Sequence, residues 1–145
     1  MNEETDIRRP LGLTLLTGLY LFFFLVTLST YGKPLPFLGR VYENGPARII
    51  IFLDSLVCLY LFLGILKRQY LTWYLVIGYN VFEIVNTIIN LRFIHIAEIE
   101  KVIGERVNQD AMIINNIICA LAILLLTQFV YRNKDYFINR QKYLF

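Results

Sequence analysis

The chain has 145 residues, of which 57% are hydrophobic, and its formal net charge is +3. This apolar share exceeds the roughly 45–50% that is typical of soluble domains, and the length corresponds to one domain. The composition therefore predicts an integral membrane protein. Because the polar segments between the apolar stretches are short, we expect no catalytic domain outside the membrane.

A helix needs about 20 predominantly apolar residues to cross the hydrocarbon core of a bilayer. Four stretches meet this requirement, at residues 11–30, 47–66, 71–91 and 111–131. We predict an all-α, polytopic membrane protein in which residues 1–145 form a single domain, an antiparallel bundle of four transmembrane helices. The first stretch is expected to remain in the mature protein, because no A-x-A-like cleavage site follows it.

The first span opens with Arg9-Pro10-Leu11-Gly12-Leu13-Thr14. This opening resembles that of a diffuse set of small, uncharacterised prokaryotic membrane proteins that continue as four spans. The resemblance covers these six residues. It implies the topology and a prokaryotic cell membrane, and it carries no particular activity. Within the same span, Thr14 and Gly18 are four residues apart, which predicts a small-xxx-small face for helix packing.

The first loop, residues 31–46, is rich in proline and glycine. This composition predicts turns and irregular extended backbone, and the apolar residues among them indicate that the loop folds over the end of the bundle. Only residues 67–70 separate the second and third spans, so these helices are expected to be antiparallel neighbours. Tyr70, Trp73 and Tyr74 fit an interfacial aromatic belt.

Residues 92–110 are polar, but isoleucine and valine recur at helical spacing from Ile96 to Val107. We expect this segment to be a polar loop that extends the third helix or lies on the membrane surface. Residues 132–145 form a basic and aromatic tail. The tail is expected to contact anionic lipid headgroups or, alternatively, to dock onto a partner.

Four spans place both termini on one side of the membrane. That side carries eight basic residues, namely Arg8, Arg9, Lys67, Arg68, Arg132, Lys134, Arg140 and Lys142. The opposite side carries six, namely Lys33, Arg40, Arg48, Arg92, Lys101 and Arg106. Because cytoplasmic loops are enriched in lysine and arginine, this bias predicts that the N- and C-termini are cytoplasmic.

Two acidic residues lie inside predicted spans, Asp54 in the second and Glu83 in the third. At about 1.5 Å of rise per residue, each lies roughly 3–4 Å from the middle of its span, toward the two longer loops. The two carboxyl groups are therefore expected at the same depth. An ionisable residue within a span costs about 2.5–3.5 kcal/mol on insertion scales, so each is a hypothesis of function.

Asparagines accompany the acids in the same half of the membrane. Those of the third span share an arc of about 120° with Glu83, and lipid does not solvate such a face. We interpret the pattern as a polar cavity that opens toward the two longer loops and ends at the acids. The candidate residues for contact with a proton, a cation or a partner are Asp54, Glu83, Asn80, Asn86, Asn90, Asn115 and Asn116.

No lysine, arginine or histidine lies at this depth in the spans, and the single histidine, His95, follows the third span. A buried carboxyl group without a counter-charge is favoured in its protonated form. The acids are then protonated and hydrogen-bonded, or bind a proton or cation in turnover, or meet a basic group of another subunit. Cys58 and Cys119 lack the C-x-x-C spacing of redox and zinc motifs. We expect no catalytic residue, metal or cofactor in this chain, and no nucleic-acid partner.

Three classes of function follow, and all of them place the chain in the lipid bilayer. The first is an accessory or assembly subunit of a larger membrane complex, in which the acidic pair contacts a partner. The second is a proton- or cation-coupled small transporter or channel that acts as an oligomer of copies of the chain. Small multidrug exporters have this size and span count, but their essential glutamate lies in the first span, which has no acid here.

The third class is a small membrane enzyme. Asn80-Val81-Phe82-Glu83 resembles the N-x-x-E element of the small four-span glutathione-using enzymes of eicosanoid metabolism. The match covers these four residues, lies in the third span rather than the second, and lacks the arginines that bind glutathione in that family. The sequence therefore favours a chain that is not an enzyme.

Overall fold

The structure is a computed structural model that describes residues 10–141. Arg8 and Arg9, which contribute to the predicted orientation, and residues 142–145 of the tail lie outside the described residues.

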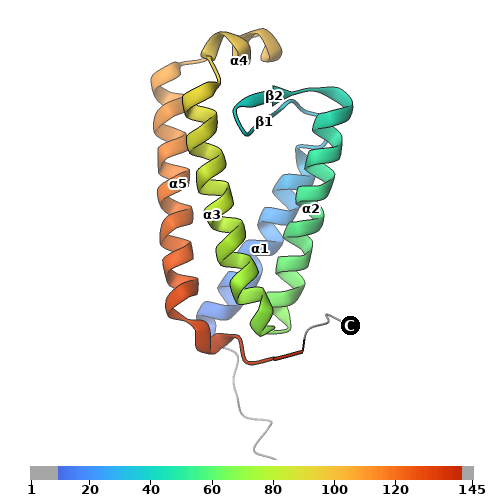
Figure 1. Ribbon diagram of the computed structural model, residues 1–145, viewed down its shortest axis with the longest axis vertical. Helices are drawn as coiled ribbons and strands as arrows, with labels where there is room; N and C mark the ends of the chain where they lie inside the picture. Colours follow the sequence, from blue (N-terminus) through green and yellow to red (C-terminus); the bar gives the residue numbers. More distant parts are fainter. Residues whose placement is uncertain (1–9, 142–145) are drawn as a thin grey trace, which may run out of the picture.

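The described chain is built on four long helices (Figure 1). These are α1 (Leu11–Ser29), α2 (Asn44–Leu66), α3 (Tyr70–Phe93) and α5 (Gln109–Arg132). Each is long and apolar enough to cross a membrane, and helices consecutive in this list run in opposite directions. The prediction of an all-α, four-helix membrane bundle is confirmed, and the protein is an integral membrane protein.

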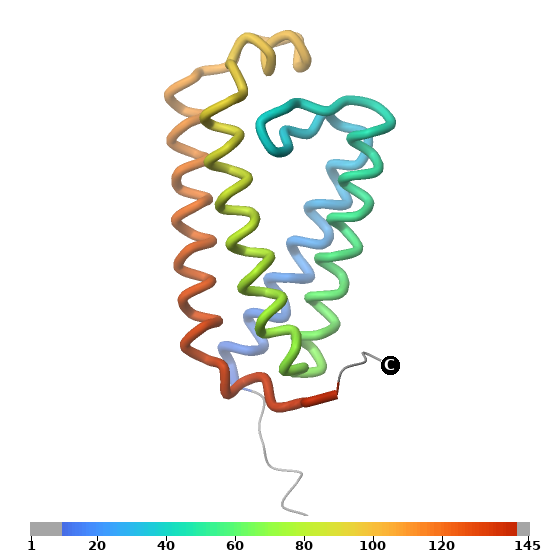
Figure 2. Tube along the Cα trace, viewed as in Figure 1, coloured from blue at the N-terminus to red at the C-terminus, as the bar shows by residue number. Residues whose placement is uncertain are grey.

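The bundle consists of two helix pairs. Helix α1 packs most extensively on α2, and α3 on α5, whereas contact between α2 and α3 is sparser. The pairs come together at the end that holds residues 10 and 141, here called the termini end (Figure 2). They diverge toward the opposite end, the loop end, so the bundle is closed at one end and splayed at the other.

The apolar core lies at the termini end. It contains residues from all four long helices and from the tail, namely Leu13, Leu16, Tyr20, Leu61, Ile65, Trp73, Val76, Val130 and Phe137. The buried indole N–H of Trp73 donates a hydrogen bond of 2.9 Å to the carbonyl oxygen of Val130. This bond joins α3 to α5 within one pair, and apolar packing in the core holds the two pairs together.

Helices α2 and α3 approach each other very closely beside the short turn that joins them. The side chain of Thr72, which is fully buried, occupies the space that a Cβ atom on Gly64 would need. In contrast, no atom of the described chain lies within 4 Å of a Cβ built on Gly18. Close helix packing within the described chain therefore occurs at Gly64, and the face at Thr14 and Gly18 contacts no other helix of the described chain at Gly18.

The described part of the tail lies along the α2–α3 turn. The N–H group of Asn139 donates to the carbonyl oxygen of Arg68 at 2.9 Å, and the N–H group of Tyr70 donates to that of Asn139 at 2.6 Å. The guanidinium of Arg68 donates in turn to the carbonyl oxygen of Tyr136 at 2.8 Å. The tail up to residue 141 is thus held against its own chain.

Lys134 begins the short 3₁₀ helix η2 (Lys134–Tyr136) and covers the predicted aromatic belt. Its Nζ atom lies 4.6 Å from the ring centroid of Trp73, 5.2 Å from that of Tyr70 and 5.5 Å from that of Tyr74. A hydrogen bond with the Tyr70 hydroxyl raises the pKa of the Lys134 ammonium above its usual value. The ammonium therefore stays charged over the rings at neutral pH.

Replacing this lysine should be visible in the fluorescence of Trp73, because the chain has a single tryptophan. In Lys134→Gln the cation leaves the indole face and water takes its place, so we expect the emission maximum to move to longer wavelength. Arg132→Gln, at the end of α5, is the matched control and should leave the spectrum unchanged. Equal spectra for wild type and Lys134→Gln would contradict the position of the Lys134 ammonium over the Trp73 ring.

The loop between α1 and α2 folds into a β-hairpin at the loop end. Strand β1 (Leu35–Phe37) pairs antiparallel with β2 (Arg40–Tyr42), with Leu35 opposite Tyr42. The turn residues Leu38 and Gly39 both have positive φ, 46° and 85°, as the tightest hairpin turns require. The predicted irregular loop is therefore ordered by backbone pairing.

The polar segment after α3 forms a separate helix, α4 (Ile96–Ile103). Helix α3 ends at Phe93, and Ile94 and His95 are extended before α4 begins. Gly104 ends α4 with a φ of 79°, in the left-handed conformation that glycine favours at this position. Helix α4 lies across the loop end of the bundle (Figure 1).

Candidate functional site

Asp54 and Glu83 line the same cavity. The cavity has a volume of about 200 Å³ and lies between α1, α2, α3 and the hairpin, with Thr27, Thr30 and Asn86 among its polar lining residues. Both acids are half-buried. The structure thus brings together the two carboxyl groups that the sequence places at one depth.

Asp54 belongs to a row of polar side chains that continues into the bundle. The hydroxyl of Tyr79 donates a hydrogen bond of 2.9 Å to Oδ1 of Asp54. The same hydroxyl lies 3.3 Å from Sγ of Cys58, which in turn lies 3.9 Å from Oγ1 of Thr27. The sequence alone does not predict Tyr79 as a partner of Asp54, although Tyr79 precedes Glu83 by four residues and so lies on the same face of the third span.

The carboxyl group of Glu83 has fewer hydrogen-bond partners than that of Asp54. The hydrogen bond at this residue joins the Thr87 hydroxyl to the backbone carbonyl oxygen of Glu83, at 2.9 Å. Within residues 10–141 no hydrogen bond reaches the Glu83 carboxyl group, and no basic side chain pairs with either acid. The described chain therefore provides hydrogen-bond acceptors at this site without a compensating positive charge.

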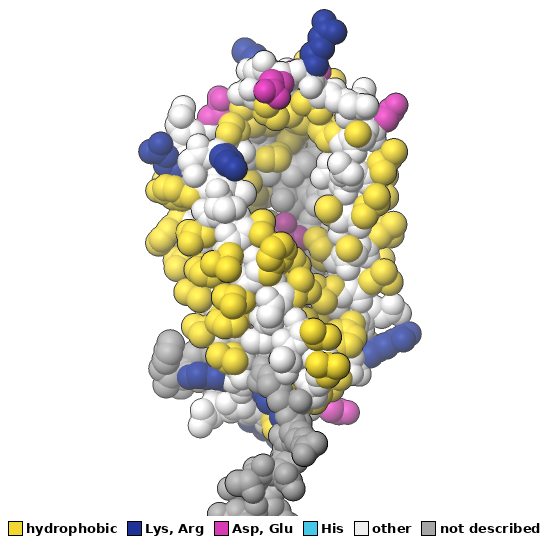
Figure 3. All heavy atoms as spheres, turned by 180° about the vertical axis from the view of Figure 1, so that it is seen from behind, with side chains coloured by type: hydrophobic (Ala, Val, Ile, Leu, Met, Phe, Trp, Pro, Cys, Tyr) yellow, Lys and Arg dark blue, Asp and Glu magenta, His cyan; other side chains and the backbone are white. Residues whose placement is uncertain are grey.

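A hollow opens on the side of the bundle. Seen from behind, the molecule is hollowed between the two helix pairs, and acidic side-chain atoms are visible inside the hollow (Figure 3). Apolar side chains surround this hollow, and charged ones gather at the two ends of the molecule. The opening thus lies at the level of the apolar belt, where lipid or another membrane protein would meet it.

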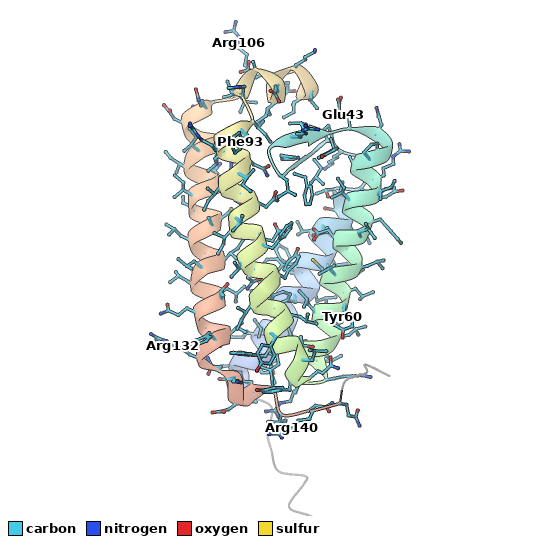
Figure 4. The ribbon with its side chains drawn as sticks, in the orientation of Figure 1. Glu43, Tyr60, Phe93, Arg106, Arg132 and Arg140 are labelled. Atoms are coloured by element: carbon cyan, nitrogen blue, oxygen red, sulfur yellow. The ribbon has the colours of Figure 1, made fainter. Side chains whose placement is uncertain are left out.

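The hairpin covers this cavity on the loop side. Leu35, Pro36 and Phe37 of β1 are among its lining residues. The tip of the hairpin packs closely on the end of α3. A Cβ atom built on Gly39 would lie 3.1 Å from Cβ of Phe93, which is labelled in Figure 4. The sequence predicts a cavity that opens toward the two longer loops, but the hairpin covers the cavity on that side.

Asn86 and Asn90 hold the hairpin in place. Oδ1 of Asn86 accepts a hydrogen bond of 2.8 Å from the N–H group of Leu38, and Oδ1 of Asn90 accepts one of 2.8 Å from Gly39. Both donors belong to the tight turn, which cannot pair them within the hairpin. These two asparagines therefore bind backbone, and Asn86 also reaches the acidic cavity.

No protein-family model, no curated protein and no solved structure matches the chain.

The other predicted asparagines lie apart from the acidic cavity. Asn80 is 3% exposed, and its Oδ1 atom accepts a hydrogen bond of 2.7 Å from the Tyr20 hydroxyl. Its Nδ2 atom is buried without a partner among the described residues. Asn116 donates to the carbonyl oxygen of Met112 in its own helix at 2.9 Å, and Asn115 is exposed on α5.

Removing the asparagine acceptors should free the hairpin. In Asn86→Ala or Asn90→Ala, a turn N–H group loses its partner, at a cost of about 1–3 kcal/mol. We expect a lower melting temperature in detergent and faster tryptic cleavage after Arg40 in β2. Asn116→Ala, whose amide bonds only within its helix, is the control. Unchanged cleavage in both hairpin variants would show that the asparagines do not fix the turn.

Proposed function

We propose that the protein is an accessory or assembly subunit of a larger membrane complex, in which Asp54 and Glu83 receive a basic group from a neighbouring membrane protein. The observation that carries the proposal is the cavity that the two acids share, in a bundle whose side is hollowed and shows acidic side-chain atoms inside the hollow (Figure 3). No basic side chain within residues 10–141 pairs with either of them. By the bias of lysine and arginine, we place the described ends at residues 10 and 141 on the cytoplasmic side.

The cost of leaving such acids unpaired supports this proposal. An acid within a membrane span is unfavourable by about 2.5–3.5 kcal/mol on insertion scales, whereas hydrogen bonds between transmembrane helices contribute on average about 0.6 kcal/mol. The single hydroxyl bond from Tyr79 therefore does not offset two acids. A lysine or arginine at the same depth would do so, with one cation facing two acceptor groups.

The counter-charge is expected from a different protein rather than from a second copy. The four apolar stretches contain no lysine, arginine or histidine at the depth of the acids. Another copy of the same chain therefore supplies no positive charge at that depth. The hollow between the helix pairs opens on a side of the bundle that is lined by apolar side chains. A transmembrane helix with one basic residue near its middle is the partner that fits this surface.

Site-specific photo-crosslinking in intact membranes tests the proposal. A photoreactive residue at Val26, which is exposed and lines the acidic cavity, should capture another membrane protein. The same residue at Leu125, which is 65% exposed on α5, is the control position. On a blue-native gel the gently solubilised chain should migrate in a larger complex. A free monomer or homo-oligomer without adducts at Val26 would refute the proposal.

A second candidate is a proton- or cation-coupled transporter or channel assembled from several copies. It is favoured by the row of titratable groups from Asp54 through Tyr79 to Cys58, along which a proton could be passed. Purified protein in liposomes should then take up protons or a monovalent cation, and the double variant Asp54→Asn, Glu83→Gln should not. Absence of uptake by the wild-type chain would eliminate this candidate.

A further inference from the structure

A second cavity lies at the loop end, and it is independent of the function proposed above. Its volume is about 590 Å³, within the range of roughly 300–1,000 Å³ that is typical of small-molecule sites. It is bounded by the hairpin, the end of α3, helix α4 and the beginning of α5. Helix α4 lies across this end of the bundle and forms one wall of the cavity (Figure 1).

The walls of this cavity are mainly aliphatic. Helix α4 contributes Ile99, Val102 and Ile103, α3 contributes Leu91, and Ile94 comes from the extended link between α3 and α4. The charged residues of α4 are not among the lining residues. Helix α4 thus turns its apolar face to the cavity and its polar face away from it, as an interfacial amphipathic helix does.

Lys33 is the single charged residue among those that line the cavity. It is exposed, and no acidic side chain within residues 10–141 pairs with it. Arg106, the basic residue just beyond α4, points away from the bundle (Figure 4). A ligand with one negative charge therefore meets one available ammonium group.

The other polar residues of the lining, Thr87, Asn90 and Asn116, are uncharged, and each donates a hydrogen bond within the described chain. The Thr87 hydroxyl donates to the carbonyl oxygen of Glu83, and the Asn116 amide to that of Met112. The Asn90 amide donates weakly to the carbonyl oxygen of Pro36, at 3.4 Å. Recognition of a charged group in this cavity therefore depends on Lys33.

We propose that this cavity binds a long-chain fatty acid, with the alkyl chain under α4 and the carboxylate at Lys33. The aliphatic lining matches an alkyl chain, and the lone ammonium matches a single carboxylate. The cavity lies at the loop end, so a fatty acid dissolved in the bilayer reaches it with its head toward the water. A two-chain phospholipid is the competing occupant that the experiment distinguishes.

Binding of radiolabelled hexadecanoic acid to the full chain in phosphatidylcholine nanodiscs at pH 8 tests the proposal. We expect Lys33→Gln to weaken binding about tenfold, as the loss of one charge-assisted hydrogen bond predicts, while Lys101→Gln on α4 binds as wild type does. Methyl hexadecanoate should compete about tenfold more weakly than the acid for the same reason.

A second pair of variants tests the position of the alkyl chain. Val102→Trp fills the cavity from α4 and should abolish binding, whereas Ala97→Trp places the same ring on the exposed face of α4 and should not. Equal binding of the acid and its methyl ester, or wild-type affinity in Lys33→Gln or Val102→Trp, would overturn the proposal. So would a phospholipid that stays bound in native mass spectra when hexadecanoic acid is added.

Discussion

Replacing Asp54 with asparagine and Glu83 with glutamine is expected to release the protein from its complex while the bundle stays folded. Asparagine keeps an oxygen that accepts the Tyr79 hydrogen bond, so the local structure is preserved. The partner's basic group, however, is left buried without a counter-charge, at a cost of about 3–5 kcal/mol. This corresponds to a loss of roughly 100-fold or more in affinity.

The measurement is migration on a blue-native gel, together with the melting temperature of the purified variant. Asp110→Asn, at the exposed beginning of α5, is the matched control and should remain in the large complex. A double variant that also stays in the complex would contradict the role of the acids as partner contacts. If it stays in the complex but loses proton or cation uptake in liposomes, the transporter is favoured instead.

Gly64→Ala, beside the turn between α2 and α3, is expected to destabilise the bundle more than alanine at a glycine with open space around it. Its Cβ atom would collide with the side chain of Thr72, which is fully buried and bonded to Gln69 at 3.0 Å. Overpacking of this kind costs about 1–3 kcal/mol. The melting temperature followed by Trp73 fluorescence should fall, because Trp73 is the neighbour of Thr72 in the same core region.

A double-mutant cycle separates the collision from other effects of the substitution. Thr72→Ala removes the two atoms that lie closest to the new Cβ, so it should partly restore stability in the Gly64→Ala background. Gly78→Ala is the control, since no described atom lies within 4 Å of its Cβ position, and alanine is the better helix former there. Equal melting temperatures for Gly64→Ala and Gly78→Ala would contradict the close approach of the Thr72 side chain to Gly64.

The helical architecture could be predicted because it depends on the length and polarity of segments. Four apolar stretches and short connections are enough to specify antiparallel spans. Helices α2, α3 and α5 are slightly longer than the predicted apolar stretches, because residues outside the stretches continue them, whereas α1 ends one residue earlier. At α5, for example, the Asn108 side chain accepts a hydrogen bond of 3.2 Å from the N–H group of Ala111 and caps the helix.

The candidate site could be predicted only in part. Rise along a helix gives the depth of Asp54 and Glu83, but their common cavity depends on helix rotation, which packing decides. The roles of Asn86 and Asn90 depend on a hairpin whose turn has Leu38 at positive φ. Because leucine is unusual in that conformation, the sequence gives no clear signal for the turn.

Because the core lies at the termini end, the helices are expected to assemble in a definite order during synthesis. Helices α1 and α2 are consecutive spans, as are α3 and α5, so each pair is able to form as soon as its second member has been translated and inserted. Joining the pairs has to wait for the last part of the chain, because Val130 and Phe137 complete the core around Leu13 and Trp73. Biogenesis is therefore expected to pass through two independently inserted helical hairpins, and a ribosome that stops before residue 130 leaves the first of them without its final packing surface.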